Sequence, residues 1–104
     1  MILSTIETIP NREINELKGI ARGSTVRTRH IGRDILAGFK NLVGGEIEEY
    51  TKLQADAREQ ALQRMIDDAA KYNADAIVNV RFTTSVITQA ASEVLAYGTA
   101  VTLK

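Results

Sequence analysis

The sequence has no cysteine and only one histidine, His30, among its 104 residues. The lack of cysteine excludes disulfides, cysteine-based zinc sites and a thiol nucleophile. A histidine cluster is excluded too, and a Ser-His-Asp triad would have to use His30. Arg27 and Arg29 precede His30, and their charge disfavours a bound cation. We therefore expect no metal site and no cofactor, and a surface or interface position for His30.

Long apolar runs are also missing, so no segment is expected to span a bilayer. The first residues lack the basic region, apolar stretch and small-residue cleavage site of a secretory signal. We expect a cytoplasmic protein that does not bind membranes. At 44% apolar and 25% charged residues, the composition is that of an ordinary globular protein, and the length fits a single domain over 1–104.

Neither sign of charge dominates, with 13 basic and 13 acidic residues, but the charges are segregated. The stretch 12–40 has seven basic and three acidic residues, whereas 46–75 has eight acidic and four basic. These halves are either complementary solvated faces of one fold or surfaces that meet between subunits. Nucleic-acid binding is not expected, because the chain is neutral and the basic stretch has no interleaved aromatics.

The N-terminal half predicts extended structure. A β-branched strand is expected over 2–7, ended by a turn at Pro10-Asn11. A longer strand is expected over 14–29, in which Gly19 and Gly23 interrupt the alternation. Glycine inside a strand usually marks a bulge, a bend or the close approach of another backbone.

Two helices are expected next. Apolar residues at three- or four-residue steps predict a short helix over 31–43, stopped by Gly44-Gly45. A long helix over 46–72 has one apolar face that is rich in alanine. Its members are Tyr50, Leu53, Ala57, Ala61, Met65, Ala69 and Tyr72.

Two strands complete the chain, over 76–86 and 93–103. In the first, we expect the even-numbered residues to face the core. The last strand has small residues on one face (Val94, Ala96, Gly98, Ala100) and large ones on the other (Leu95, Tyr97, Val101, Leu103). The small face suits the alanine-rich helix. Because a chain of this size offers little to cover the large face, we expect a partner subunit there.

Five stretches carry a family resemblance that runs through the whole chain. They are Arg33-Asp34-Ile35, Gly44-Gly45-Glu46, the pattern Arg58-x-x-Ala61-x-x-x-Met65, Ala74-Asp75-Ala76-Ile77 and Tyr97-Gly98-Thr99-Ala100-Val101. In this order and spacing the sequence resembles the YbjQ-like family, widespread in bacteria and catalogued as a "putative heavy-metal-binding" domain of unknown function. The resemblance implies an α+β subunit of β-β-α-α-β-β order, with an antiparallel sheet packed on one short and one long helix. It further implies a dodecin-subunit-like fold and a ring-shaped homopentamer.

Five residues are candidates for ligand binding or subunit contacts. Arg33 and Asp34 would form an intersubunit ion pair or contact a polar ligand, or Asp34 simply suits the start of a helix. Glu46 is a ligand or general base if it faces a pocket, and otherwise stabilises the first turn of its helix. Arg81 is an interface ion-pair partner or an exposed charge. Tyr97 stacks on a planar ligand or packs in the core.

The function expected from these patterns is an oligomeric binding or scaffold protein whose ring holds a small ligand or ion. A divalent-ion binder that uses only carboxylates is a variant of it. The alternative is an enzyme that uses Glu46, Arg33 and Asp34 at subunit junctions, but no nucleophile, metal or cofactor motif supports it.

Overall fold

The computed structural model describes residues 1–28, 45–88 and 91–104, with the side chains of 28 and 45–54 outside the description. Along this part of the chain the elements are β1 (Ile2–Leu3), β2 (Ile14–Thr28), α2 (Gly45–Ala70), β3 (Ala76–Thr88) and β4 (Ala91–Leu103). The short helix expected over 31–43 lies outside the described residues. The long helix and the last two strands are confirmed within a few residues of the expected bounds.

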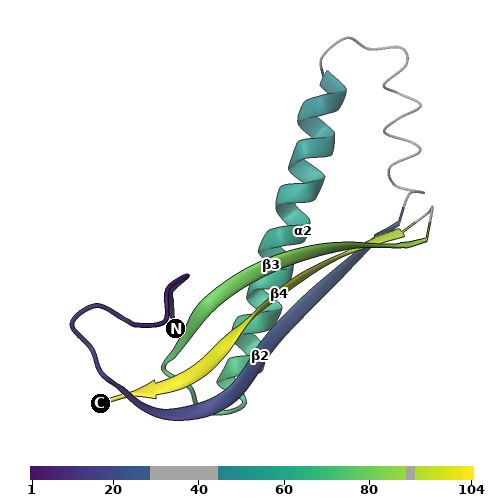
Figure 1. Ribbon diagram of the computed structural model, residues 1–104. Helices are drawn as coiled ribbons and strands as arrows, with labels where there is room; N and C mark the ends of the chain where they lie inside the picture. The colour runs from purple at the N-terminus through teal and green to yellow at the C-terminus, as the bar shows by residue number, and fades with distance from the viewer. Residues whose placement is uncertain (29–44, 89–90) are drawn as a thin grey trace.

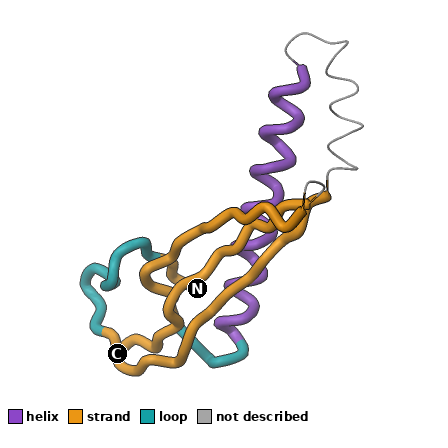
Figure 2. Tube along the Cα trace, turned by 45° about the vertical axis from the view of Figure 1, so that its right-hand side comes forward, coloured by secondary structure: helices purple, strands orange, loops and turns teal. Residues whose placement is uncertain are grey.

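A four-stranded sheet in the order β1-β3-β4-β2 packs against α2 (Figure 1). Strand β4 is antiparallel to both of its neighbours, β3 and β2, but β1 runs parallel to β3. The sheet is therefore mixed, which corrects the expectation of an antiparallel sheet. The N-terminal end of α2 extends beyond the strands (Figure 2).

Strand β1 is only two residues long, not the six expected over 2–7. The Ser4 hydroxyl accepts a hydrogen bond from the Ile6 backbone N–H at 3.1 Å and lies 3.0 Å from the Thr8 carbonyl. A side chain that bonds to its own neighbouring backbone competes with the extended conformation. The segment after Leu3 therefore curls, although Val80 N–H still donates to Ser4 O.

The two glycines of β2 mark an irregularity in strand pairing and the close approach of another backbone. Gly19, with φ at +147°, follows a register shift between β2 and β4. At Gly23 a Cβ atom would lie 2.5 Å from the carbonyl oxygen of Ala61 and overlap the backbone of Met65. Gly23 is therefore the point at which the helix backbone lies directly on the sheet.

The alanine-rich face of α2 is confirmed as the face packed on the sheet for its described helical members, whereas Tyr72, expected on the same face, follows the helix and is 41% exposed. Ala57, Ala61, Met65 and Ala69 are completely buried. They form one cluster with small residues of β2 and β4, among them Ala21, Val94, Ala96 and Ala100, and with Ile77 and Val80 of β3. Small side chains on both sides bring helix and sheet close together.

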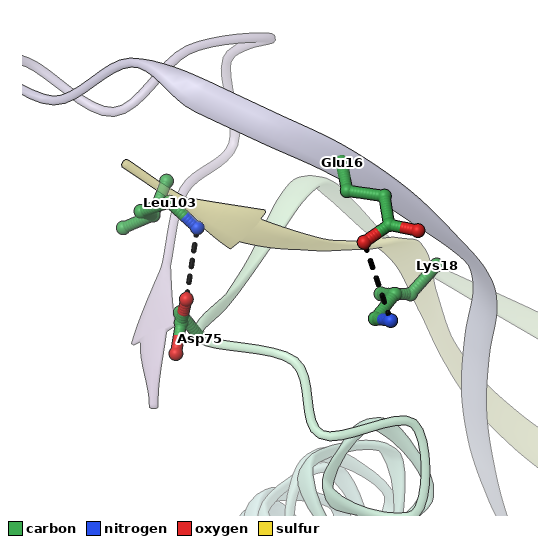
Figure 3. Close-up of polar contacts among 4 residues, drawn as sticks. All are labelled: Glu16, Lys18, Asp75 and Leu103. Carbon is green, nitrogen blue, oxygen red and sulfur yellow. Dashed lines mark hydrogen bonds and ion pairs between the residues drawn. The ribbon is translucent and has the colours of Figure 1, made fainter.

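The turn after α2 is held by two local features. Asn73 adopts φ +57°, the left-handed conformation that often ends helices, and Ala74 N–H donates to Ala69 O. The Asp75 carboxylate then accepts a hydrogen bond from Leu103 N–H at 2.8 Å (Figure 3). This hydrogen bond links the residue before β3 to the last residue of β4.

The expected alternation along β3 is wrong at its first residues, where Ile77 faces the helix and Ala76 and Val78 face away from it. Asn79 has φ +54°, and the register with β4 shifts between Val78 and Arg81. A bulge inserts one residue and reverses which parity faces which side. Val80 therefore joins the helix-side cluster, whereas Val78 lies in a second cluster with Ile9. Val86, expected in the core, is 79% exposed.

The second cluster lies on the sheet face away from α2. It contains Ile9, Ala76, Val78, Val101 and Leu103. The segment after β1 thus covers part of the large face of β4 from within the same chain, which we had assigned wholly to a partner subunit. Within the described residues no helix is long and apolar enough to cross a membrane.

Candidate interaction surface

The part of the sheet face away from α2 that Ile9 does not cover is the main candidate surface. We call it the open sheet face. Residues directly opposite one another in antiparallel strands share a face, so its members follow from the register with Val101 and Leu103. They are Ile14, Leu17, Ile20, Arg22, Ser24 and Val26 of β2, Glu93, Leu95, Tyr97 and Thr99 of β4, and Arg81, Thr83 and Ser85 of β3.

Large apolar side chains on this face are exposed to water. Leu17 is 69% exposed, Ile20 67% and Val26 51%, with Ile14 and Tyr97 at 38%. Monomeric soluble proteins expose apolar residues singly, whereas a contiguous apolar group marks an interaction site. The open sheet face therefore has the composition of a contact surface.

A row of three polar or aromatic residues crosses the middle of this face. Tyr97 is the direct partner of Arg22 on one side and of Arg81 on the other. Directly opposite residues have Cβ atoms about 4.5 to 5.5 Å apart, so both arginine side chains start beside the tyrosine ring. Among the described residues, the ion pairs are Lys18 with Glu16 (Figure 3) and Lys104 with Glu13, so this row includes no carboxylate partner.

Arg81 has a structural contact of its own. Its Nη1 atom donates to the carbonyl oxygen of Thr5 at 2.7 Å and to that of Val80 at 2.9 Å. Arg81 therefore holds the segment after β1 against the edge of β3. The residue is exposed in the single chain, and its partners there are backbone carbonyls.

The candidate residues do not all come together in the described structure. Arg81 and Tyr97 are neighbours, and Tyr97 belongs to neither buried cluster. Glu46 is the second residue of α2, but its side chain lies outside the description, as do Arg33, Asp34 and His30.

Arg22 completes the row and was missed by sequence reasoning. The sequence feature that could have identified Arg22 is its position between Ala21 and Gly23, two small residues that the structure places on the helix side. Alternation in a strand places Arg22 on the opposite face.

No metal centre can be built from the described side chains. Among the side chains of residues 1–27, 55–88 and 91–104 there is no group of three or more histidine, cysteine or acidic residues that could hold an ion. The described structure has instead an exposed apolar surface, the open sheet face, and two arginines on it, Arg22 and Arg81.

The fold and the surface define a class: a small α+β subunit, one helix on a mixed sheet, with an exposed apolar sheet face. The chain belongs to the YbjQ family, whose model, described as "Putative heavy-metal-binding", matches residues 1–104. Relatives occur in archaea as well as bacteria, so the family is not confined to bacteria.

A UPF0145 protein of Archaeoglobus fulgidus is 60% identical over 104 residues and covers 100% of this chain and 96% of its own. A UPF0145 protein of Vibrio campbellii is 57% identical and covers 99% of each chain. Among solved structures, a protein of unknown function from the DUF74 family of Pediococcus pentosaceus shares the fold. It has a TM-score of 0.66 at 17% identity and covers 100% of this chain and 98% of its own.

Proposed function

We propose that this protein is a self-assembling scaffold whose subunits associate through the open sheet face and whose assembly holds a small ligand or ion. The observation that carries the proposal is the exposure of Leu17, Ile20 and Val26 together on one face of β2. Burying apolar surface stabilises an interface by about 25 cal/mol per Å² before the entropic cost of association is subtracted. A cytoplasmic setting, expected from the sequence, is part of the proposal.

The charges on the open sheet face favour a ring over a two-fold dimer. A two-fold contact of this face with itself, with the axis passing near Tyr97, would bring Arg22 and Arg81 toward the same residues of the second copy. A head-to-tail contact avoids this repulsion, and such contacts close into rings when the rotation allows it. The family resemblance favours five subunits.

Acidic residues elsewhere on the chain can supply the opposite charge. The described part of α2 exposes Asp56, Glu59 and Asp67, whereas Arg58 and Arg64 are its exposed basic residues. Arg64 is engaged with the backbone of Ser24. The acidic stretch found in the sequence is thus available for a neighbouring subunit, in line with the second interpretation of the segregated charges.

The first test is the mass in solution. Light scattering coupled to size exclusion is expected to give several times the 11.4 kDa of one chain, with five copies favoured. The double variant Leu17→Lys/Ile20→Lys places two charges on the open sheet face and is expected to release monomers. The control Glu7→Lys changes the net charge by the same two units at an exposed position after β1, outside α2 and outside the residues of the open sheet face, and should keep the wild-type mass. A wild-type monomer at micromolar concentration would refute the proposal.

The second test addresses the ligand. Thermal-shift screening of the purified assembly against metal ions and metabolites is expected to find a stabilising compound. A ligand at a hundred times its dissociation constant adds about 2.7 kcal/mol to the folded state. The enzyme hypothesis rests on Arg33, Asp34 and Glu46, whose side chains lie outside the description, and nothing in the described residues favours it.

A further inference from the structure

Strand β2 is an edge strand, and its middle is protected by helix side chains. The sheet order places β2 at one end, next to β4 only. An edge strand presents free backbone N–H and C=O groups to which another chain can add a strand. With 15 residues and the β-branched pair Thr25-Val26, β2 is long enough to be such a template.

Two side chains of α2 form hydrogen bonds with backbone groups of this edge. The backbone N–H of Arg22 donates to Asp68 Oδ2 at 3.0 Å, and Arg64 Nη1 donates to the carbonyl oxygen of Ser24 at 2.6 Å. In an antiparallel pair, alternate residues direct their backbone groups away from the neighbouring strand. Arg22 and Ser24 are two residues apart, so both belong to this outward-directed set. We call the two contacts the edge clasp.

The spacing of helix and strand makes the edge clasp possible. Arg64 and Asp68 are four residues apart on α2, a rise of about 6 Å. Arg22 and Ser24 are two residues apart on β2, about 6.7 Å along the strand. Because Gly23 has no side chain, the helix backbone lies against the strand between them. The helix therefore places one acceptor and one donor beside the strand, as a neighbouring strand would.

We propose that the edge clasp closes β2 against strand addition, and that the partner it excludes is a β-strand of a second copy of this chain. Both groups are charged, and hydrogen bonds to charged groups are stronger than those between neutral ones. An incoming strand would have to displace the carboxylate from Arg22 N–H and the guanidinium from Ser24 O. Copies can then meet through other surfaces without the sheets merging edge to edge.

The test compares two variants of equal composition change. Arg64→Ala/Asp68→Ala removes the edge clasp, whereas Arg58→Ala/Asp67→Ala removes the same two residue types from exposed positions of the same helix. Hydrogen exchange should show the Arg22 amide exchanging about tenfold faster in the first variant only, as expected from losing a charged hydrogen bond. Sedimentation velocity should show species heavier than wild type that grow with concentration, and thioflavin T should report added β-structure.

Equal exchange at Arg22 and equal mass in the two variants would overturn the proposal. If the double variant does not fold, the pair Asp68→Asn and Asp68→Leu decides. Asparagine keeps an acceptor oxygen and should retain wild-type exchange and mass, whereas leucine should not, and identical behaviour of the two overturns the proposal. A wild-type monomer that stays monomeric with the clasp intact would refute the function proposed above but not this inference.

Discussion

At Gly23, the addition of a single methyl group should lower the stability of the protein. The missing side chain of this residue leaves room for the backbone of α2 at Ala61 and Met65. We expect Gly23→Ala to push the helix from the sheet and lower the free energy of unfolding by at least about 1 to 3 kcal/mol, the usual range for overpacking. Urea denaturation measures it.

Ser24→Ala is the matched control for Gly23→Ala. Ser24 is adjacent in β2 but its side chain lies on the opposite face, and its known contact uses the backbone oxygen. A change within about 0.5 kcal/mol is expected. If the two variants have the same denaturation midpoint, the close approach at Gly23 does not limit packing.

Asp75 should stabilise the protein through its bond to the backbone of β4. Removing the carboxylate leaves Leu103 N–H without its 2.8 Å acceptor. We expect Asp75→Ala to lower the free energy of unfolding by about 1 to 3 kcal/mol, because the acceptor is charged. Thermal unfolding by circular dichroism measures the change. Asp56→Ala, at an exposed helix position, should leave the midpoint nearly unchanged, and a similar loss there would contradict the assignment.

At the scale of the element, α2 depends on the small size of its buried face. Ala57, Ala61 and Ala69 have no exposed surface. We expect Ala61→Leu to lower the denaturant midpoint by an amount equivalent to about 1 to 3 kcal/mol, because the added side chain has no space against β2.

Glu59→Gln, two residues away on the exposed side, should change the free energy of unfolding by under about 0.5 kcal/mol. Equal midpoints for Ala61→Leu and Glu59→Gln would mean that the alanine face does not pack tightly on the sheet. Circular dichroism of both variants would confirm that α2 still forms.

At the scale of the whole molecule, the family description raises the question of soft metals. The chain has no cysteine, and the described residues contain no cluster of metal-binding side chains. Thiolate and imidazole are the ligands that zinc and copper prefer. We expect calorimetric titration with either ion to show no site tighter than about micromolar. Tight stoichiometric binding that is lost in His30→Ala would contradict this prediction.

Sequence alone determined the elements that depend on local pattern. The apolar period of α2, the small face of β4 and the strand glycines all predicted contacts that the structure has, since side-chain direction follows from helix and strand periodicity. The same reasoning named Arg81 and Tyr97 as candidates. It did not reveal that they are neighbours, because that depends on the register of β3 with β4.

Tertiary structure decided what depends on pairing between distant residues. The parallel β1, the bulge at Asn79 that moves Val80 to the helix side, and the row of Arg22, Tyr97 and Arg81 all follow from strand register. A shift of one residue exchanges the two faces of a strand, so local pattern cannot fix which residues meet. The edge clasp likewise joins residues 46 and 40 positions apart in the sequence, and only the packed helix and sheet bring them together.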